Sequence, residues 1–199
     1  MNVSHINRGI FSSESNFNHR YMKDDPTLRK FVGNSRGLGL RIVLTQGTYD
    51  MVHIGHARYF EAAKKYGDIL VVGVDSDEKV RARKGPDRPV VPEAERLEMV
   101  CHLRSVDAVY LKKHNAPKWN LIKMIRPDVL IATKETYDKQ QLKDLKKYCG
   151  KVVVLNPQAT TSTSAKLRRL QIGIASRFEK TLVPKIMTAV EDALKEVKG

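Results

Sequence analysis

Two histidines, His53 and His56, stand where a short apolar run gives way to a helical pattern. The apolar run covers residues 42–44, and the helix expected after the histidines covers residues 57–66. The first N–H groups of a helix lack intrahelical partners and attract anions. Imidazoles can donate hydrogen bonds to charge that develops on phosphate oxygens. The pair therefore suits a phosphate site; the alternative is that one histidine caps the helix and the other is a surface residue.

Three further polar groups follow expected strands or begin expected helices. Asp75 and Asp77 come after the second apolar run, where capping a helix is the commoner role. The basic segment 81–89 can be a solvated linker or a source of mobile cations for phosphates. Residues 160–164 are five hydroxyl side chains in a row, more than one helix cap requires, and they form a second possible anion cradle.

These residue types favour holding phosphates over attacking them. The order of residues shows no Ser-His-Asp set, no cysteine nucleophile paired with histidine, no G-x-x-x-x-G-K-[ST] loop and no Cys/His spacing for zinc. In direct phosphoryl or nucleotidyl transfer, positioning and electrostatics supply most of the rate. A bound triphosphate would bring a divalent cation, for which we expect Mg²⁺, and we expect no metal ligands from the protein itself.

Apolar runs alternate with amphipathic segments along most of the chain. The expected strands cover residues 41–45, 68–74, 108–111, 129–132 and 152–155, and the expected helices cover residues 57–66, 77–83, 93–103, 118–125, 139–149 and 164–170. This alternation predicts an α/β fold, a Rossmann-like open parallel sheet with helices on both faces. Such sheets bind ligands at the carboxyl ends of their strands, and His53 and His56 follow the first strand directly.

The ends of the chain differ from this central part. Residues 1–40 are expected to form a polar N-terminal arm and connector, mobile to about residue 25, with a short helix over 26–32 and a glycine-rich link over 33–39. Residues 41–172 are expected to form the α/β domain. Residues 173–199 predict a C-terminal amphipathic helix, whose apolar stripe either packs on its own domain or forms a dimer contact.

Composition narrows the class of protein. With 41% hydrophobic residues among 199, the chain can bury a core, and its longest apolar run, residues 69–74, is far below the roughly 20 residues of a membrane span. The net charge of +14 suits a polyanionic partner, but the basic residues are spread out, which disfavours nucleic acid. Two cysteines indicate a reducing compartment, so we expect a cytoplasmic enzyme with no membrane partner.

Residues 47–56, G-T-Y-D-M-V-H-I-G-H, resemble the G-x-F-D-x-x-H-x-G-H signature of the cytidylyltransferase-like nucleotidyltransferases. Residues 161–164 resemble the second signature of that family, I-S-T-T, and the resemblance spans roughly residues 41–170. Residues 84–90 resemble the K-G-x-x-R-P-V segment of adenylyltransferases that act on heptose 1-phosphate. Those enzymes have a Gly-Gly-Asp-Tyr-like element where this chain has Lys-Glu-Thr-Tyr at 134–137, a departure that concerns the acceptor.

The resemblance implies an enzyme that condenses a nucleoside triphosphate, by preference ATP, with a phosphorylated small-molecule acceptor such as a sugar 1-phosphate, releasing pyrophosphate. It implies catalytic roles for His53, His56 and Lys84, and contacts to the acceptor for Asp50, Asp75 and Lys134. It implies nucleotide binding by Gln46, Gly47, Thr48, Tyr49, Gly55, Arg83, Arg88, Thr161, Ser162, Thr163 and Ser164. Because the family often dimerises, we also expect a homodimer.

Two alternatives stay open at this point. One is a cytidylyltransferase for glycerol 3-phosphate using CTP, although such enzymes usually carry an arginine shortly before I-S-T-T, where this chain has Pro157. The other is a basic nucleotide- or nucleic-acid-binding module without catalysis, which need not retain both histidines.

Overall fold

The computed structural model describes residues 17–133, 136–156, 170, 173–174 and 177–198. The chain divides into two compact units, Met1–Thr160 and Thr161–Gly199, and each is described by itself. The sequence predictions for Lys134, for the hydroxyl run 160–164 and for the helix 164–170, apart from Leu170, lie outside the described residues.

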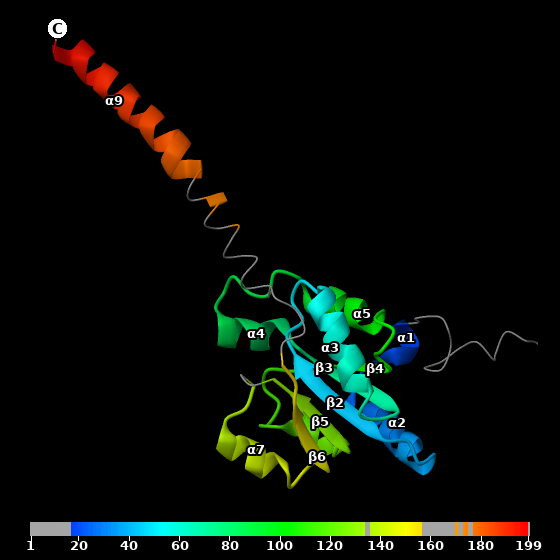
Figure 1. The fold of residues 1–199 in the computed structure, drawn as a ribbon. Coiled ribbons are helices and arrows are strands. Elements are labelled where there is room, and N and C mark those ends of the chain that lie inside the picture. The colour runs from blue at the N-terminus through cyan, green and yellow to red at the C-terminus, as the bar shows by residue number, and fades with distance from the viewer. Residues whose placement is uncertain (1–16, 134–135, 157–169, 171–172, 175–176, 199) are drawn as a thin grey trace, which may run out of the picture. The chain divides into compact units, whose positions relative to one another are not determined.

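The first unit is built on a six-stranded sheet in the order β1-β4-β3-β2-β5-β6, and every registered pair of strands is parallel (Figure 1). The strands are β1 Tyr21–Met22, β2 Ile42–Gly47, β3 Ile69–Asp75, β4 Ala108–Lys112, β5 Val129–Ala132 and β6 Lys151–Val154. The five strands expected from the sequence are confirmed, each within a residue or two. From β2 the chain moves outward through β3 and β4, then returns to β5 on the other side. The switch point between β2 and β5 is where such sheets bind ligands.

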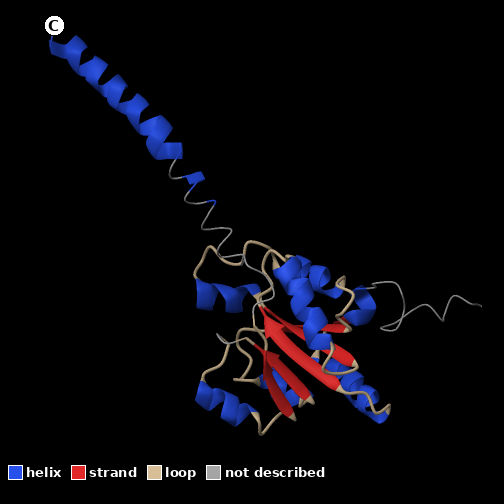
Figure 2. Ribbon diagram, viewed as in Figure 1, coloured by secondary structure: helices blue, strands red, loops and turns tan. Residues whose placement is uncertain are grey.

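Helices cover both faces of the sheet, as the apolar runs predicted (Figure 2). The helices of this unit are α1 Phe17–Arg20, α2 Asp25–Gly37, α3 Ile54–Lys64, α4 Asp77–Lys84, α5 Glu93–Cys101, α6 Asn120–Ile125 and α7 Lys139–Leu145. Residues of α2, α6 and α7 pack into the core on one face, and residues of α3 and α5 pack into the core on the other. The sheet is therefore buried between two layers, which explains its unbroken Val, Ile and Leu runs.

Residues 17–38 are not the arm and connector that the sequence predicted, although the helix expected over 26–32 is confirmed and is longer than expected. Strand β1 adds to the edge of the sheet beside β4, and α2 continues through the expected glycine-rich link to Gly37. Asp24 caps α2 by accepting a hydrogen bond from Thr27 N at 2.8 Å. At its other end Arg36 donates to the carbonyl of Ile125, the last residue of α6, at 2.7 Å. Capping and tertiary packing thus outweigh the low helix propensity of glycine.

The second unit contains the expected C-terminal helix. A π-helical turn, η2 Phe178–Leu182, leads into α9 Val183–Lys198. Pro184, in the first turn of α9, has no N–H to donate to the preceding turn, a known cause of local departure from α-helical hydrogen bonding. Phe178, Leu182, Ile186, Val190 and Leu194 recur at every fourth position and are exposed. Among the described residues, no helix is long and apolar enough to cross a membrane.

Candidate active site

The two histidines cap α3 reciprocally. His53 is the N-cap, and its Nδ1 accepts a hydrogen bond from Gly55 N at 3.1 Å. His56, three residues on, accepts a hydrogen bond from His53 N through its own Nδ1 at 3.3 Å. The imidazole rings lie with their centroids 4.1 Å apart. The cap and the phosphate site, which the sequence left as alternatives, are therefore compatible in one arrangement.

This capping arrangement determines the tautomer of both rings. A ring nitrogen that accepts a hydrogen bond carries no proton, so Nδ1 of each neutral imidazole is unprotonated. The proton of each neutral ring then lies on Nε2. Each histidine can accordingly cap the helix with one nitrogen and donate a hydrogen bond with the other.

Tyr49 folds back over the end of β2 and supports His56. It is buried, its ring meets the His56 ring edge-on at 5.6 Å between centroids, and its backbone has a positive φ of 52°. A Cβ added to Gly47 would lie 2.9 Å from Cζ of this ring. Gly47 is thus required for Tyr49 to pack here, and Tyr49 in turn supports the side chain of His56.

Gly47→Ala is expected to displace the Tyr49 ring, because the new methyl group occupies the space against which the ring packs. Overpacking of this kind costs about 1–3 kcal/mol of unfolding free energy. Denaturant titration measures that loss, and Gly33→Ala, where a Cβ meets nothing within 4 Å, is the matched control. Equal stability of the two variants would contradict the assigned role of Gly47.

Asp50 organises the loop that follows α4. Its carboxylate accepts hydrogen bonds from Val90 N and Val91 N at 3.0–3.1 Å and pairs with Arg88 at 2.7 Å. Both Asp50 and the Arg88 side chain are largely buried. Asp50 therefore orients a loop, and Arg88 is held by that carboxylate rather than being a mobile cation.

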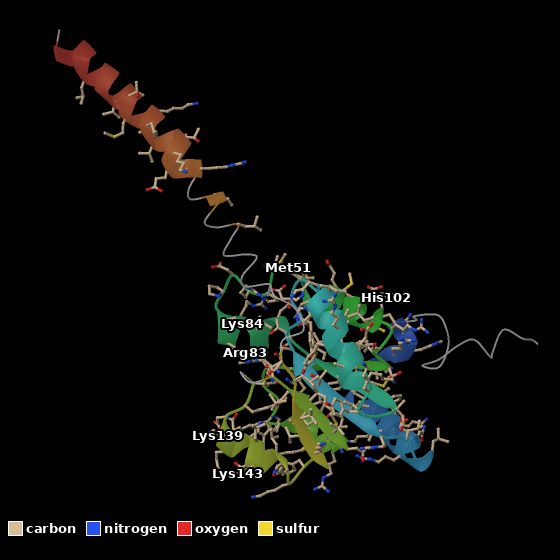
Figure 3. The ribbon with its side chains drawn as sticks, in the orientation of Figure 1. Met51, Arg83, Lys84, His102, Lys139 and Lys143 are labelled. Atoms are coloured by element: carbon tan, nitrogen blue, oxygen red, sulfur yellow. The ribbon has the colours of Figure 1, made fainter. Side chains whose placement is uncertain are left out.

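Asp75, at the end of β3, gathers three cations. Its buried carboxylate lies 2.9 Å from Arg83 Nη2, 2.9 Å from Lys112 Nζ and 3.9 Å from Lys79 Nζ. The same Nη2 of Arg83 also donates to Thr48 Oγ1 at 2.9 Å, which links the end of β2 to α4. Figure 3 shows Arg83 and Lys84 side by side on α4. Desolvation, then the charges of Arg83 and Arg88, lower the pKa of Lys84 below its ordinary value.

Neither Asp75 nor Asp77 caps α4, which corrects one interpretation of the sequence. Ser76 is the N-cap, and its Oγ accepts a hydrogen bond from Lys79 N at 3.3 Å. The basic residues 81–84 form the last turns of α4 and are not a linker. Asp77 instead accepts a hydrogen bond from Arg96.

Arg96 was not predicted and is fully buried, with 0% of its side chain exposed. Its guanidinium donates to the carbonyls of Thr48, Asp75 and Val91 and to the carboxylate of Asp77. These groups belong to the ends of β2 and β3, the start of α4 and the loop held by Asp50. One side chain therefore connects the segments that carry most of the candidate site. The pattern that could have indicated its burial is its position four residues before Val100, a buried residue on the same face of α5.

Gln46 and Tyr137 meet at the switch point. Gln46 Nε2, on β2, donates to the hydroxyl of Tyr137, which follows β5, at 3.1 Å. Burial and then the charge of Asp75 raise the pKa of Tyr137, so its hydroxyl stays protonated and able to donate. Here β2 and the segment after β5 present an amide and a hydroxyl, whereas the ends of β3 and β4 present the cations around Asp75.

The structure thus groups the predicted residues by contact. Thr48, Asp75 and Arg83 form one cluster, Asp50 and Arg88 a second, and the two histidines a third with Gly55. Among the described residues, no group of three or more His, Cys, Asp or Glu side chains could hold a metal ion. Together these features form a strand-end site able to bind phosphates through cations and backbone N–H groups.

A sequence model of the cytidylyltransferase-like family matches residues 44–191. The chain belongs to this family of nucleotidyltransferases. The matched residues include the two histidines, Arg96 and the cluster of Thr48, Asp75 and Arg83.

Curated relatives carry the same region. The chain is 43% identical over 142 residues to the bifunctional protein HldE of Methylobacillus flagellatus, covering 70% of this chain and 29% of that protein. It is 32% identical over 149 residues to the bifunctional protein HldE of a Nitratiruptor species, covering 74% and 32%. The chain therefore spans about a third of the length of the curated relatives it matches, in agreement with the resemblance to an adenylyltransferase domain.

Solved structures agree with the fold. A lipopolysaccharide core biosynthesis protein of Thermoplasma volcanium matches with a TM-score of 0.53 and 28% identity, covering 60% of this chain and 98% of that one. A pantoate-beta-alanine ligase of Francisella tularensis matches with a TM-score of 0.52 at 14% identity, which concerns the fold alone.

Proposed function

We propose that this protein transfers the nucleotidyl group of ATP to a sugar 1-phosphate, by preference a heptose 1-phosphate, and releases pyrophosphate. The observation that carries the proposal is the reciprocal cap of α3, which leaves Nε2 of both histidines as the donor nitrogen. The HldE relatives support an adenylyl rather than a cytidylyl group. The residues of K-G-x-x-R-P-V at 84–90 support a sugar phosphate as acceptor.

In the proposed reaction an acceptor phosphate oxygen attacks the α-phosphorus of ATP in line, and the bond to the β-phosphate oxygen breaks as pyrophosphate leaves. Nε2–H groups of His53 and His56 donate to the oxygens on which negative charge increases in the transition state. Because Gly55 has no side chain, a phosphate can come close to the backbone at the N-terminus of α3, where anions are favoured. No covalent enzyme intermediate is required.

The remaining predicted residues receive binding roles in this proposal. Arg83 and Lys84 attract the β- and γ-phosphates, and Thr48 positions Arg83. Lys134 and the hydroxyls of Thr161, Ser162, Thr163 and Ser164 are assigned to acceptor and nucleotide on the resemblance alone. We assign Mg²⁺ to the bound triphosphate, where it would neutralise phosphate charge. We also propose a cytoplasmic location, because Cys101 and Cys149 are buried and form no disulfide.

A pyrophosphate-release assay tests the function by crossing ATP and CTP with heptose 1-phosphate, other sugar 1-phosphates and glycerol 3-phosphate. We expect turnover with ATP and a sugar 1-phosphate. Turnover only with CTP and glycerol 3-phosphate would establish the cytidylyltransferase alternative. If no pair turns over and binding to RNA or DNA shows a steep dependence on salt, the non-catalytic binding module would replace both.

We also propose that two copies of the chain associate through the apolar face of η2 and α9, packed antiparallel. Residues 177–185 contain three basic and one acidic side chain, whereas residues 191–198 contain three acidic and two basic ones. Antiparallel pairing brings these unlike segments together, whereas parallel pairing brings like segments together.

Ile186→Glu is expected to raise the dissociation constant of this dimer by about a hundredfold or more, because like charges meet where the two helices cross. Analytical ultracentrifugation measures the change. Met99→Glu on α5, where the native side chain is similarly exposed, is the control. A wild-type chain that sediments as a monomer would contradict the proposal. Cross-linking of Leu182→Cys to Val190→Cys would confirm the antiparallel arrangement.

A further inference from the structure

Lys112 is the most buried of the three cations around Asp75. The last residues of β3 and β4 are in register, Asp75 beside Lys112, so their side chains lie on the same face of the sheet. A Cβ on Gly73 would lie 2.8 Å from Lys112 Cδ, which shows that the aliphatic stem of the lysine crosses β3 where a glycine leaves room. Its side chain is 17% exposed, whereas that of Arg83 is 54% exposed.

The two cations also differ in what holds them. Lys112 lies on strand β4. Burial lowers the pKa of Lys112, and the negative charge of Asp75 opposes this shift. Arg83 stands on the last turn of α4 and reaches Asp75 and Thr48 through a long, half-exposed side chain. A buried carboxylate that loses its only cation is strongly destabilised. With Lys112 in place, Asp75 keeps a cation at 2.9 Å even when Arg83 turns away.

We propose that Lys112 is a positioning residue that releases Arg83 for the triphosphate. Lys112 neutralises Asp75 permanently, and Arg83 exchanges its bonds to Asp75 and Thr48 for bonds to the β- and γ-phosphates. This inference rests on the proposed function, because it assigns Arg83 to the nucleotide. On this proposal, the Asp75–Lys112 ion pair influences the affinity for ATP without contacting the nucleotide.

The test measures the dissociation constant of ATP with Mg²⁺ by titration calorimetry, which requires no turnover. In Lys112→Met, Asp75 keeps Arg83 at 2.9 Å and the more distant Lys79 at 3.9 Å. Arg83 is therefore retained there, and the dissociation constant is expected to rise about tenfold, the value of one charge-assisted hydrogen bond. Lys113→Met, at the exposed neighbouring position, is the control and is expected to leave affinity unchanged. Adding Asp75→Asn to Lys112→Met removes the charge that retains Arg83 and is expected to restore affinity.

The double variant separates positioning from a structural role. It also remains usable if Lys112→Met alone fails to fold, because it leaves no unpaired buried charge. Affinity that stays low in the double variant, or an unchanged affinity in Lys112→Met, would overturn the inference. The binding test and the pyrophosphate-release assay can fail separately. A wild type that binds ATP without turnover refutes the proposed function. Equal ATP affinity of Lys112→Met and Lys113→Met refutes only the role of Lys112.

Discussion

Replacing His56 with alanine is expected to lower kcat for pyrophosphate release by about a hundredfold or more, the usual cost of removing one transition-state donor. The same change removes the acceptor for His53 N and so weakens the cap of α3. Loss of a cap costs about 1 kcal/mol of unfolding free energy, which leaves a typical domain folded at assay temperature. We therefore expect kcat to fall far more than the fraction of folded protein does.

His56→Glu separates the two roles of this side chain. Glutamate at the third helical position is the residue that ordinarily completes a capping box, so the cap is retained. Its carboxylate cannot donate to a phosphate oxygen and repels it. We expect near wild-type unfolding free energy together with a rate as low as that of His56→Ala. Full activity in either variant would show that His56 only caps α3.

The strands and the histidine site were predictable because their signals are local. Each buried strand is a run of apolar residues, and His53 and His56 are only three positions apart in the chain as well as close in space. Strand β1 was missed because two residues carry no periodicity, and its place depends on pairing with β4 far along the chain. Helix α2 was predicted too short, since packing of Arg36 against the end of α6 is invisible in local propensity.

The charged residues that organise the site were harder to predict. Arg96 stands among acidic residues in a helix that reads as a solvated surface, and Lys112 begins a pair of lysines that suggests an exposed loop. Both residues donate a hydrogen bond to Asp75, which is 21 residues from Arg96 and 37 residues from Lys112 in sequence. Only the folded sheet shows that both residues meet the end of β3. The sequence therefore located the residues assigned to phosphate but not Arg96 and Lys112, which help to hold them in place.

Arg96→Met is expected to lower the unfolding free energy by about 3–5 kcal/mol, because it removes the cation of a buried ion pair and leaves its acceptors without donors. Its guanidinium is the shared donor to the carbonyls of Thr48 and Asp75 at the ends of β2 and β3. Denaturant titration measures the loss. Arg29→Met, an exposed arginine on α2, should stay within about 0.5 kcal/mol of wild type and is the control.

Arg96→Lys tests whether geometry or charge matters at this position. A lysine keeps the charge beside Asp77, but its ammonium cannot span the four acceptors that the planar guanidinium reaches. We therefore expect intermediate stability, with kcat reduced more than KM is raised, because the ends of β2 and β3 would be held less firmly in place during transfer. Wild-type stability in Arg96→Met would contradict the central role assigned to this side chain. Full recovery by lysine would show that charge alone is sufficient.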